Sequence, residues 1–412
     1  MYFHSVTLDK EKCRGCTNCI KRCPTEAIRV QNGKAKIIKE RCIDCGQCIR
    51  YCPHHAKMAV TDELDMLSNY KYKVALPPPS LYGQFKNKPE VDRILTALKK
   101  AGFDEVYEVA LAAEAVTKAT KEMFTTTRMK YPVISSACPA VVKLIMVRFP
   151  DLIQNLLPII SPMELAAIKA RERAVKNTGF NPEEIGVFFI TPCAAKVTCA
   201  RLPIGINESV VDGCISVGDV YRKMVGIIDK LEEIEKLSVA TFEGVEWARN
   251  GGESYALSTD KRIAVDGIEN VIDVLEKVDD GQLSDIIFIE ASSCIGGCIG
   301  GPLAVENAFV AKTRIQNIRS TPYVKTPIDV KTDELRFKRP IEANSIMNLS
   351  SDVAEAISMM GELKNIEKEL PGLDCGSCGS PSCRALAEDI VRGFANEMDC
   401  IIKIREKFKN ES

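Results

Sequence analysis

Cysteine is the residue type in this sequence that points most clearly to a chemical function. The chain has 412 residues, with 18 cysteines and only 3 histidines. The cysteines form three groups, which lie within residues 13–52, 138–298 and 375–400. In a reducing compartment, clustered cysteines bind metal or do redox chemistry more often than they form disulfides. The scarcity of histidine argues against zinc sites with several histidines and favours thiolate-rich sites.

The first group is an internal repeat of the pattern C-x2-C-x2-C-x3-C-P. This pattern is typical of a small ferredoxin that holds two [4Fe–4S] clusters, in which the fourth thiolate of each cluster comes from the other repeat. We therefore predict one cluster on Cys13, Cys16, Cys19 and Cys52. We predict the second cluster on Cys42, Cys45, Cys48 and Cys23. A structural zinc site is the alternative.

The last group consists of Cys375, Cys378, Cys383 and Cys400. Its sequence, LDCGSCGSPSCRALAEDI, resembles the [4Fe–4S] domain of corrinoid iron–sulfur proteins. Glycine and serine between the ligands let the backbone wrap around a cubane and donate N–H groups to its sulfur atoms. We predict a third accessory [4Fe–4S] cluster here, with zinc or free thiols as the alternative.

The central group lies in segments that resemble the signature loops of the [FeFe]-hydrogenase catalytic domain. These segments are LPPPSLYG (76–83), SSACPA (135–140), TPCAAK (191–196) and EASSCIGGCIGGP (290–302), and the resemblance covers roughly residues 70–310. It implies that an H-cluster cubane is bound by Cys138, Cys193, Cys294 and Cys298. Cys298 would also bridge the cubane to a di-iron subcluster that carries CO and cyanide ligands.

The same resemblance assigns contacts to the cyanide ligands of the di-iron subcluster. Lys196 would contact one cyanide, and Pro79 and Ser80 would contact the other. Anionic ligands in a dry pocket need a cation and fixed donors, because an isolated buried charge is costly. Cys199 and Cys214 fall outside the cluster motifs, and we expect both to pack as small buried residues.

The sequence departs from the family pattern along the proton path. Most members have a cysteine before the first cluster ligand, which passes protons, but Ala137 stands at that position. A methyl group cannot donate or accept a proton, so the usual relay lacks its first member. Leu157 aligns with the relay's serine, and Thr120 and Met123 fall near its two glutamates. Two nearby carboxylates stay open as members of the usual relay, Glu114 and Glu122.

Two further substitutions change the pocket itself. Methionines that pack against the di-iron site in the family are replaced by Thr191 and Ser292, whose hydroxyl groups make the pocket more polar. Protons need another route, and the candidate relays are Glu290 and Glu253, whose pKa burial would raise. The alternatives are a structural ion pair for Glu290 and a helix-start role for Glu253.

The remaining sequence predicts three domains. Short β-rich runs alternate with helical patterns over residues 70–340, which is typical of α/β architecture. We expect strands at 72–77, 105–111, 186–192 and 285–291, and helices at 139–150, 162–176, 350–370 and 384–408, with a polar linker at 325–348. The predicted fold is a small α+β ferredoxin domain (1–60), an α/β H-cluster domain with mixed sheets in two lobes (61–345) and a small, mainly helical Fe–S domain (346–412).

Composition narrows the function classes. With 55 basic and 56 acidic residues, the chain gives no support for nucleic-acid binding. Its apolar runs are far shorter than the roughly 20 residues that a membrane span needs. The first residues also lack the apolar stretch of a signal peptide, so we expect a soluble, cytoplasmic protein.

Three functions fit these motifs: a slow, hydrogen-sensing hydrogenase, an ordinary ferredoxin-linked catalytic hydrogenase, and a non-enzymatic iron–sulfur scaffold. The altered proton path favours the first and resembles the sensory branch of the family. The resemblance implies that H2 and protons are the substrates and that the partner is a ferredoxin-like or other redox or signalling protein. It also implies separate maturation proteins that install the di-iron subcluster.

Overall fold

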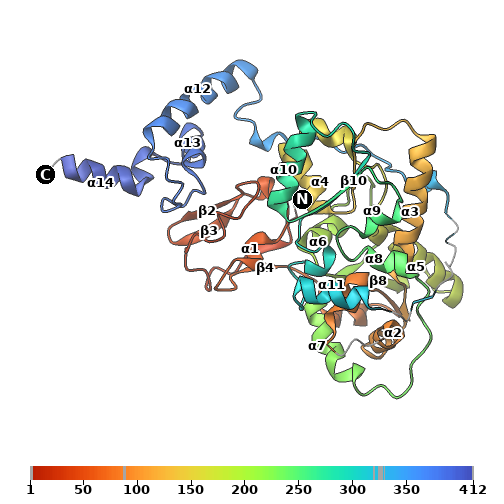
Figure 1. Cartoon of the computed structure of the whole chain (residues 1–412). Coiled ribbons are helices and arrows are strands. Elements are labelled where there is room, and N and C mark those ends of the chain that lie inside the picture. Colours follow the sequence, from red (N-terminus) through yellow and green to blue (C-terminus); the bar gives the residue numbers. More distant parts are fainter. Residues whose placement is uncertain (1–2, 87–89, 319–320, 323–327, 329, 411–412) are drawn as a thin grey trace. The chain divides into compact units, whose positions relative to one another are not determined.

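A computed structural model describes residues 3–86, 90–318, 321–322, 328 and 330–410. The chain forms two compact units (Figure 1). Unit 1 consists of both ends of the chain, Met1–Ala59 and Ala343–Ser412, and unit 2 consists of Val60–Glu342. The predicted ferredoxin and C-terminal segments thus pack in one unit, while the division into three domains stays a prediction.

The N-terminal part of unit 1 is a small α+β structure, as predicted. Strand β1 (Val6–Leu8) pairs with β4 (Lys57–Ala59), and β2 (Ile28–Gln31) pairs with β3 (Lys34–Ile37), both antiparallel. Asn32 and Gly33 join β2 to β3 with positive φ angles of 51° and 69°. This is the Asn-Gly turn that suits the twist of a two-residue hairpin. Short helical segments follow at Lys39–Arg41 and Gln47–Arg50 (α1).

The C-terminal part of unit 1 is helical, as predicted. It consists of the turn Ser345–Met347, α12 (Val353–Glu369), α13 (Cys383–Val391), the turn Glu397–Asp399 and α14 (Ile401–Asn410). Its core is built from Leu363, Leu370, Leu386, Ala387 and Cys400. The predicted linker at 325–348 lies partly outside the described residues.

The prediction of one helix over 384–408 is wrong. Helix α13 ends at Val391, and Gly393 follows with a φ of +76°, a left-handed conformation that commonly ends helices. We predicted that Cys400 lies within this helix, but it lies directly before α14.

Unit 2 contains two sheets, and its strands face a common site from two lobes. One sheet has the order β6-β5-β8-β9 and the other has the order β10-β11-β7. Their bounds are β5 Tyr72–Leu76, β6 Glu105–Val106, β7 Val133–Ile134, β8 Ile185–Thr191, β9 Gly213–Ser216, β10 Arg262–Asp266 and β11 Phe288–Ser292. The two-lobed α/β fold is confirmed, with one refinement. Described strands within each sheet pair in parallel, because long crossover segments join them.

Helices cover the faces of both sheets (Figure 1). They are α2 Val91–Lys100, α3 Val109–Thr126, α4 Pro139–Arg148, α5 Pro162–Thr178, α6 Ala194–Arg201, α7 Val217–Ile228, α8 Phe242–Glu246, α9 Gly252–Ala256, α10 Ile268–Asp279 and α11 Ala308–Gln316. Short 3₁₀ turns lie at Leu64–Asn69, Pro79–Gln84, Pro150–Asn155, Pro182–Glu184, Cys298–Gly300 and Thr332–Leu335. None of the described helices is both long and apolar enough to cross a membrane.

Local sequence explains the elements that carry the site. All seven residues of β8 are buried, as expected for a parallel strand with a covered face on each side. Ser161 caps the N-terminus of helix α5, because its hydroxyl accepts a hydrogen bond from the Glu164 amide, and left-handed Gly179 follows the last residue of the helix. The predicted strand at 105–111 is wrong beyond Val106, since α3 begins at Val109 and uses its apolar residues to pack the core.

Candidate functional site

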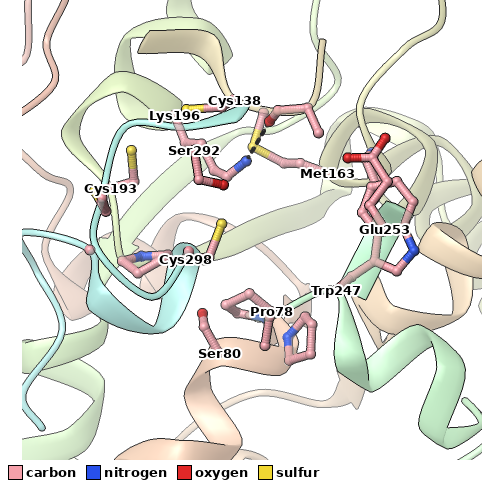
Figure 2. A pocket seen from close by; sticks show the side chains of 18 of the residues that line it. Pro78, Ser80, Cys138, Met163, Cys193, Lys196, Trp247, Glu253, Ser292 and Cys298 are labelled. Atoms are coloured by element: carbon pink, nitrogen blue, oxygen red, sulfur yellow. Dashed lines mark hydrogen bonds between the residues drawn. The ribbon is translucent and has the colours of Figure 1, made fainter. Parts of the chain in front are cut away.

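One cavity of unit 2 is lined by all four central cysteines that we predicted as ligands. Cys138 and Cys193 directly precede α4 and α6, after strands β7 and β8, and Cys294 follows β11. Cys298 begins the 3₁₀ turn that ends at Gly300. The cavity therefore lies beyond the C-terminal ends of parallel strands, where ligand sites of α/β sheets commonly form. Figure 2 shows the sulfur atoms of Cys138, Cys193 and Cys298 around this space.

The loop between Cys294 and Cys298 requires glycine. Gly297 has a φ of +85°, and a Cβ atom there would lie 2.5 Å from the backbone nitrogen of Asn250. Other residues rarely adopt this conformation, and here they would also clash with backbone. The glycines that the sequence places between the two cysteines thus let this loop pass close to the 249–250 backbone while it presents both thiols to the cavity.

Lys196 supplies the positive charge of the cavity. Its Nζ atom donates a hydrogen bond to the carbonyl oxygen of Ala137 at 3.1 Å (Figure 2). Burial lowers the pKa of Lys196, but attraction to Cys298, Cys193 and Cys138 outweighs this effect and raises its pKa above 10.5. The ammonium group is therefore charged and faces the anionic ligands that a thiolate cluster would bring.

The cavity also fits a group larger than a single metal ion. Besides the four thiols, which alone would complete the ligand set of one metal ion, its lining carries Lys196 and Ser80. Ser80 lines it, and its buried hydroxyl has no hydrogen-bond partner among the described residues. A buried polar group normally has a partner, so this hydroxyl fits a ligand that accepts its hydrogen bond.

Two buried carboxylates that we predicted as relay candidates line the same cavity. Glu253 accepts a hydrogen bond from the Ser135 hydroxyl at 2.7 Å, and that hydroxyl accepts one from the Ala137 amide at 3.2 Å. Glu290 accepts hydrogen bonds from the amides of Gly251 and Ser254, both at 2.8 Å. Burial raises the pKa of both carboxyl groups, and the negative charge of Glu290 raises that of Glu253 further.

The other predicted site residues occupy different positions. Pro79, Ala137 and Ser292 line the cavity with Lys196. Thr191 does not line it. The Thr191 hydroxyl instead donates to the Cys193 carbonyl at 2.9 Å and accepts from the Cys193 amide at 3.1 Å. It therefore shapes the ligand loop and does not make the cavity wall more polar.

Apart from Ala137, the positions that align with or near the usual proton relay do not line the cavity. Its described lining does not include Leu157, Thr120, Met123, Glu114 or Glu122. Glu114 instead accepts hydrogen bonds from the amide and hydroxyl of Thr241, at 2.6 and 2.9 Å. Cys199 and Cys214 are buried outside the cavity lining, and burial raises the pKa of both thiols.

Sequence reasoning missed several residues of the cavity wall. Met163, Trp247 and Ser135 line the cavity, and Trp247 donates a hydrogen bond to the Thr117 hydroxyl at 3.1 Å. Trp247 is the only tryptophan of the chain, and this was the one sequence feature that could have pointed to it as a site residue. Ser135 lies inside the quoted SSACPA segment, but its link to Glu253 joins residues 118 positions apart and has no local pattern.

The N-terminal cysteines form two sets in unit 1. A small cavity is lined by Cys13, Cys16, Cys19 and Cys52, which is the first set that we predicted. In the second set, burial raises the pKa of Cys45, and the charges of Cys23, Cys48 and Cys42 raise it further, so these thiols are neighbours. The repeats match in detail, since the amides of Ala27 and Ala56 donate to Cys23 and Cys52 at 3.2 Å.

The C-terminal cysteines gather around the core of α12 and α13. Cys400 is buried in this core, and Cys378 and Cys383 pack against it. Cys375 is exposed, and hydrogen bonds from Ser377 lower its pKa. The loop is held by Asp374, whose carboxylate accepts a hydrogen bond from the Cys383 amide at 2.6 Å. None of the eighteen cysteines, all of which lie in the described residues, forms a disulfide.

Family models match the three cysteine groups. The model described as iron only hydrogenase large subunit, C-terminal domain, matches residues 71–258 and 219–302, together more than half of the chain. A 4Fe-4S dicluster domain model matches residues 5–53, and an Fe-S cluster model matches residues 370–402.

Curated relatives cover most of the chain at low identity. The periplasmic [Fe] hydrogenase large subunit of Nitratidesulfovibrio vulgaris is 25% identical over 72% of this chain and 86% of its own length. Iron hydrogenase 1 of Clostridium pasteurianum is 21% identical over 77% of this chain and 68% of its own length. An NADP-reducing hydrogenase subunit of Solidesulfovibrio fructosivorans is 23% identical, and the match spans about half (55%) of that relative.

A solved structure shares the fold. The apo form of an [FeFe]-hydrogenase from Chlamydomonas reinhardtii aligns with a TM-score of 0.50 at 14% identity. The alignment covers 68% of this chain and 96% of that one. At this identity the likeness concerns the fold alone.

Proposed function

Because the chain belongs to the [FeFe]-hydrogenase family, we propose that it interconverts hydrogen with protons and electrons at an H-cluster, slowly and as a hydrogen sensor. The observation that carries this proposal is the single cavity lined by the four central cysteines, Lys196 and Ser80. Family membership supports hydrogen chemistry in general. The slow, sensing form rests on the changed proton path at Ala137.

The cavity residues have distinct roles in this proposal. Cys138, Cys193, Cys294 and Cys298 would hold the cubane, and Cys298 would also bridge it to the di-iron subcluster. When bound, the H-cluster supplies the iron at which hydrogen is split or formed. Lys196 would pair with one anionic ligand of the subcluster, and the Ser80 hydroxyl would donate to another, beside Pro79. Trp247 and Met163 help to exclude water, which strengthens these electrostatic contacts.

Protons would travel through Glu253. Ala137 offers no side-chain group for a proton, but its peptide contacts both Lys196 and Ser135. Ser135 in turn donates to the carboxylate of Glu253. Two buried carboxyl groups side by side cannot both ionise easily, so Glu253 and Glu290 would share one proton near neutral pH. Glu253 would carry it, because two backbone amides already occupy the oxygens of Glu290.

This route explains why turnover would be slow. A cysteine at position 137 would place an ionisable group directly beside the first cluster ligand. With Ala137, a proton must cross from the Ser135–Glu253 pair to the site without a proton-carrying side chain at position 137. An ordinary catalytic hydrogenase is the second candidate, and it is favoured by the presence of all four cysteines and Lys196 in one cavity.

The accessory clusters and the location belong to the same proposal. Three [4Fe–4S] clusters on the N- and C-terminal cysteines would carry electrons to a ferredoxin-like or signalling partner. Maturation proteins would install the di-iron subcluster. Clustered cysteine motifs that bind metal suit a reducing compartment, and we place the protein in the cytoplasm, although one relative is named as periplasmic. Cell fractionation tests the location.

Dye-linked turnover of matured protein tests the proposed reaction. We expect measurable hydrogen oxidation and proton reduction, both slower than those of the Clostridium pasteurianum relative assayed alongside. Cys298→Ala should abolish both, whereas Cys214→Ala, which removes a buried thiol outside the cavity lining, should leave them largely unchanged. Rates equal to those of the relative would favour the ordinary hydrogenase, and no turnover in either direction would contradict the proposal.

A further inference from the structure

The C-terminal cysteine loop lies directly against strand β2 of the N-terminal module, within unit 1. The amide of Val30 donates a hydrogen bond to the carbonyl oxygen of Gly379 at 2.8 Å. Gly379 has a φ of +87°, and a Cβ atom on it would collide with the Val30 carbonyl oxygen. Only glycine therefore allows this loop, which follows Cys378, to approach the strand so closely.

Buried ion pairs hold α13 in the same place. The guanidinium of Arg29 donates to both carboxylate oxygens of Asp389, at 2.5 and 3.0 Å, and the Ser380 hydroxyl donates to the same carboxylate at 3.1 Å. Arg41 pairs with Glu388, the neighbouring residue on α13. Burial raises the pKa of Glu388, but hydrogen bonds and attraction from Arg41 and Arg392 outweigh it and lower that pKa.

These contacts fix the docking geometry. Arg29, Arg41, Glu388 and Asp389 are each at most 9% exposed. Removing one partner of such a pair leaves a buried charge without compensation, which is strongly destabilising. Two-pronged contacts between arginine and carboxylate also set the orientation of the groups they join. The buried ion pairs therefore hold the two parts of unit 1 in one arrangement, which the connecting chain alone would not fix.

Val30 lies between the C-terminal loop and the first cysteine set. It lines the small cavity of Cys13, Cys16, Cys19 and Cys52, and it also lines a hollow with Cys378. The loop meets the first repeat at a second point, since a Cβ atom on Gly376 would lie 3.2 Å from Lys21 and 3.4 Å from Ile20. Ile20 and Lys21 lie between Cys19 and Cys23 in the sequence.

We infer that the C-terminal cluster exchanges electrons directly with the cluster of Cys13, Cys16, Cys19 and Cys52, with the Val30 contact as the junction. One cubane gains the electron that the other loses, and no bond is made or broken. This inference rests on the cluster assignments of the proposed function. In this arrangement the buried ion pairs keep the two cysteine sets at a constant separation.

Electron paramagnetic resonance of the reduced, cluster-loaded protein tests this inference. Two neighbouring reduced cubanes interact magnetically, and the interaction weakens steeply as they separate. We expect the C-terminal cluster's signal to be split by such an interaction in the full chain. Cys16→Ala should remove the splitting, and Cys45→Ala, which disables the other N-terminal cluster, should leave it in place. The opposite pattern, or no splitting in the full chain, would overturn the inference.

A matched pair of glycine variants tests the docking itself. Gly379→Ala should reduce the splitting while the number of spins per chain is retained, because the new Cβ atom pushes the loop away from Val30. Gly393→Ala places the same side chain at a φ of +76° with no atom within 4 Å, and it should leave the splitting unchanged. Equal splitting in both variants would overturn the docking argument. These readouts need no hydrogen turnover, so they can fail while the proposed hydrogenase function stands, and the reverse also holds.

Discussion

Replacing Glu253 by glutamine removes the proposed proton carrier with the smallest change of shape. In the wild type the Ser135 hydroxyl donates to the Glu253 carboxylate at 2.7 Å. The amide oxygen of glutamine can still accept this hydrogen bond, so the cavity wall should be retained. Loss of a positioned proton-transfer group typically lowers a rate by 10²–10⁴-fold, and the lower limit corresponds to about 2.7 kcal/mol in the barrier. We therefore expect turnover of Glu253→Gln to fall by about a hundredfold or more.

The same argument predicts in which direction turnover changes with pH. Burial and the charge of Glu290 raise the pKa of Glu253, so the proton is held at neutral pH and lost as the pH rises through the raised value. Proton reduction by the wild type should fall over that range, and Glu253→Gln should lose this dependence. Glu114→Gln is the matched control, because Glu114 is a buried carboxylate outside the cavity lining.

Dye-linked assays of both variants, with infrared spectra to verify an intact site, provide the measurement. Turnover of Glu253→Gln within a factor of a few of the wild type would refute the role of Glu253. A large loss in Glu114→Gln instead would point back to the usual relay of the family.

Four further outcomes follow from the same structure. Glu290→Gln should also slow turnover, by roughly a hundredfold, because it abolishes the charge that keeps the shared proton on Glu253; unchanged turnover with an intact infrared spectrum would remove Glu290 from the route. Ala137→Cys should restore little activity in the same dye assay, since Leu157, which aligns with the serine of the usual relay, has no group that carries a proton. A large gain would show that position 137 alone limits turnover. Glu164→Gln should stabilise the protein at pH 8 by about 3 kcal/mol, measured by urea unfolding. Burial raises the pKa of Glu164 from 4.5 to about 7, so between these pH values the folded state holds a proton that the unfolded state releases, and the stability of the wild type falls as the pH rises. Equal stability of the two proteins at pH 8 would contradict this. Deleting the chain after Asn348 should leave dye-linked turnover largely intact, because the C-terminal cysteines belong to unit 1 and the cavity to unit 2; loss of activity in a folded, cluster-loaded truncation would show the opposite.

The cluster ligands could be predicted from the sequence because their spacing is local. Repeats such as the one from Cys13 to Cys52 encode a metal site within a few dozen residues, and loops such as TPCAAK carry ligand and cation together. The strand Ile185–Thr191 could also be predicted, since its run of apolar residues before Thr191 is typical of a strand that is covered on both faces.

Tertiary contacts decided what the sequence could not predict. The segment after Val106 has the composition of a strand, but packing of α3 draws Val109 into a helix. Gly393 interrupts the last helix through a left-handed backbone, which a glycine only permits and does not require. The pair of Arg29 and Asp389 joins residues 360 positions apart, so no local pattern announces it.

Infrared spectroscopy of the matured protein tests the central claim most directly. The account predicts bands from bound CO and cyanide, because the cavity of Cys138, Cys193, Cys294 and Cys298 would hold the di-iron subcluster beside Lys196. Iron analysis of the same sample should approach about eighteen atoms per chain, from four cubanes and one di-iron subcluster. A fully cubane-loaded protein without CO and cyanide bands would contradict the account and would leave the non-enzymatic scaffold in its place.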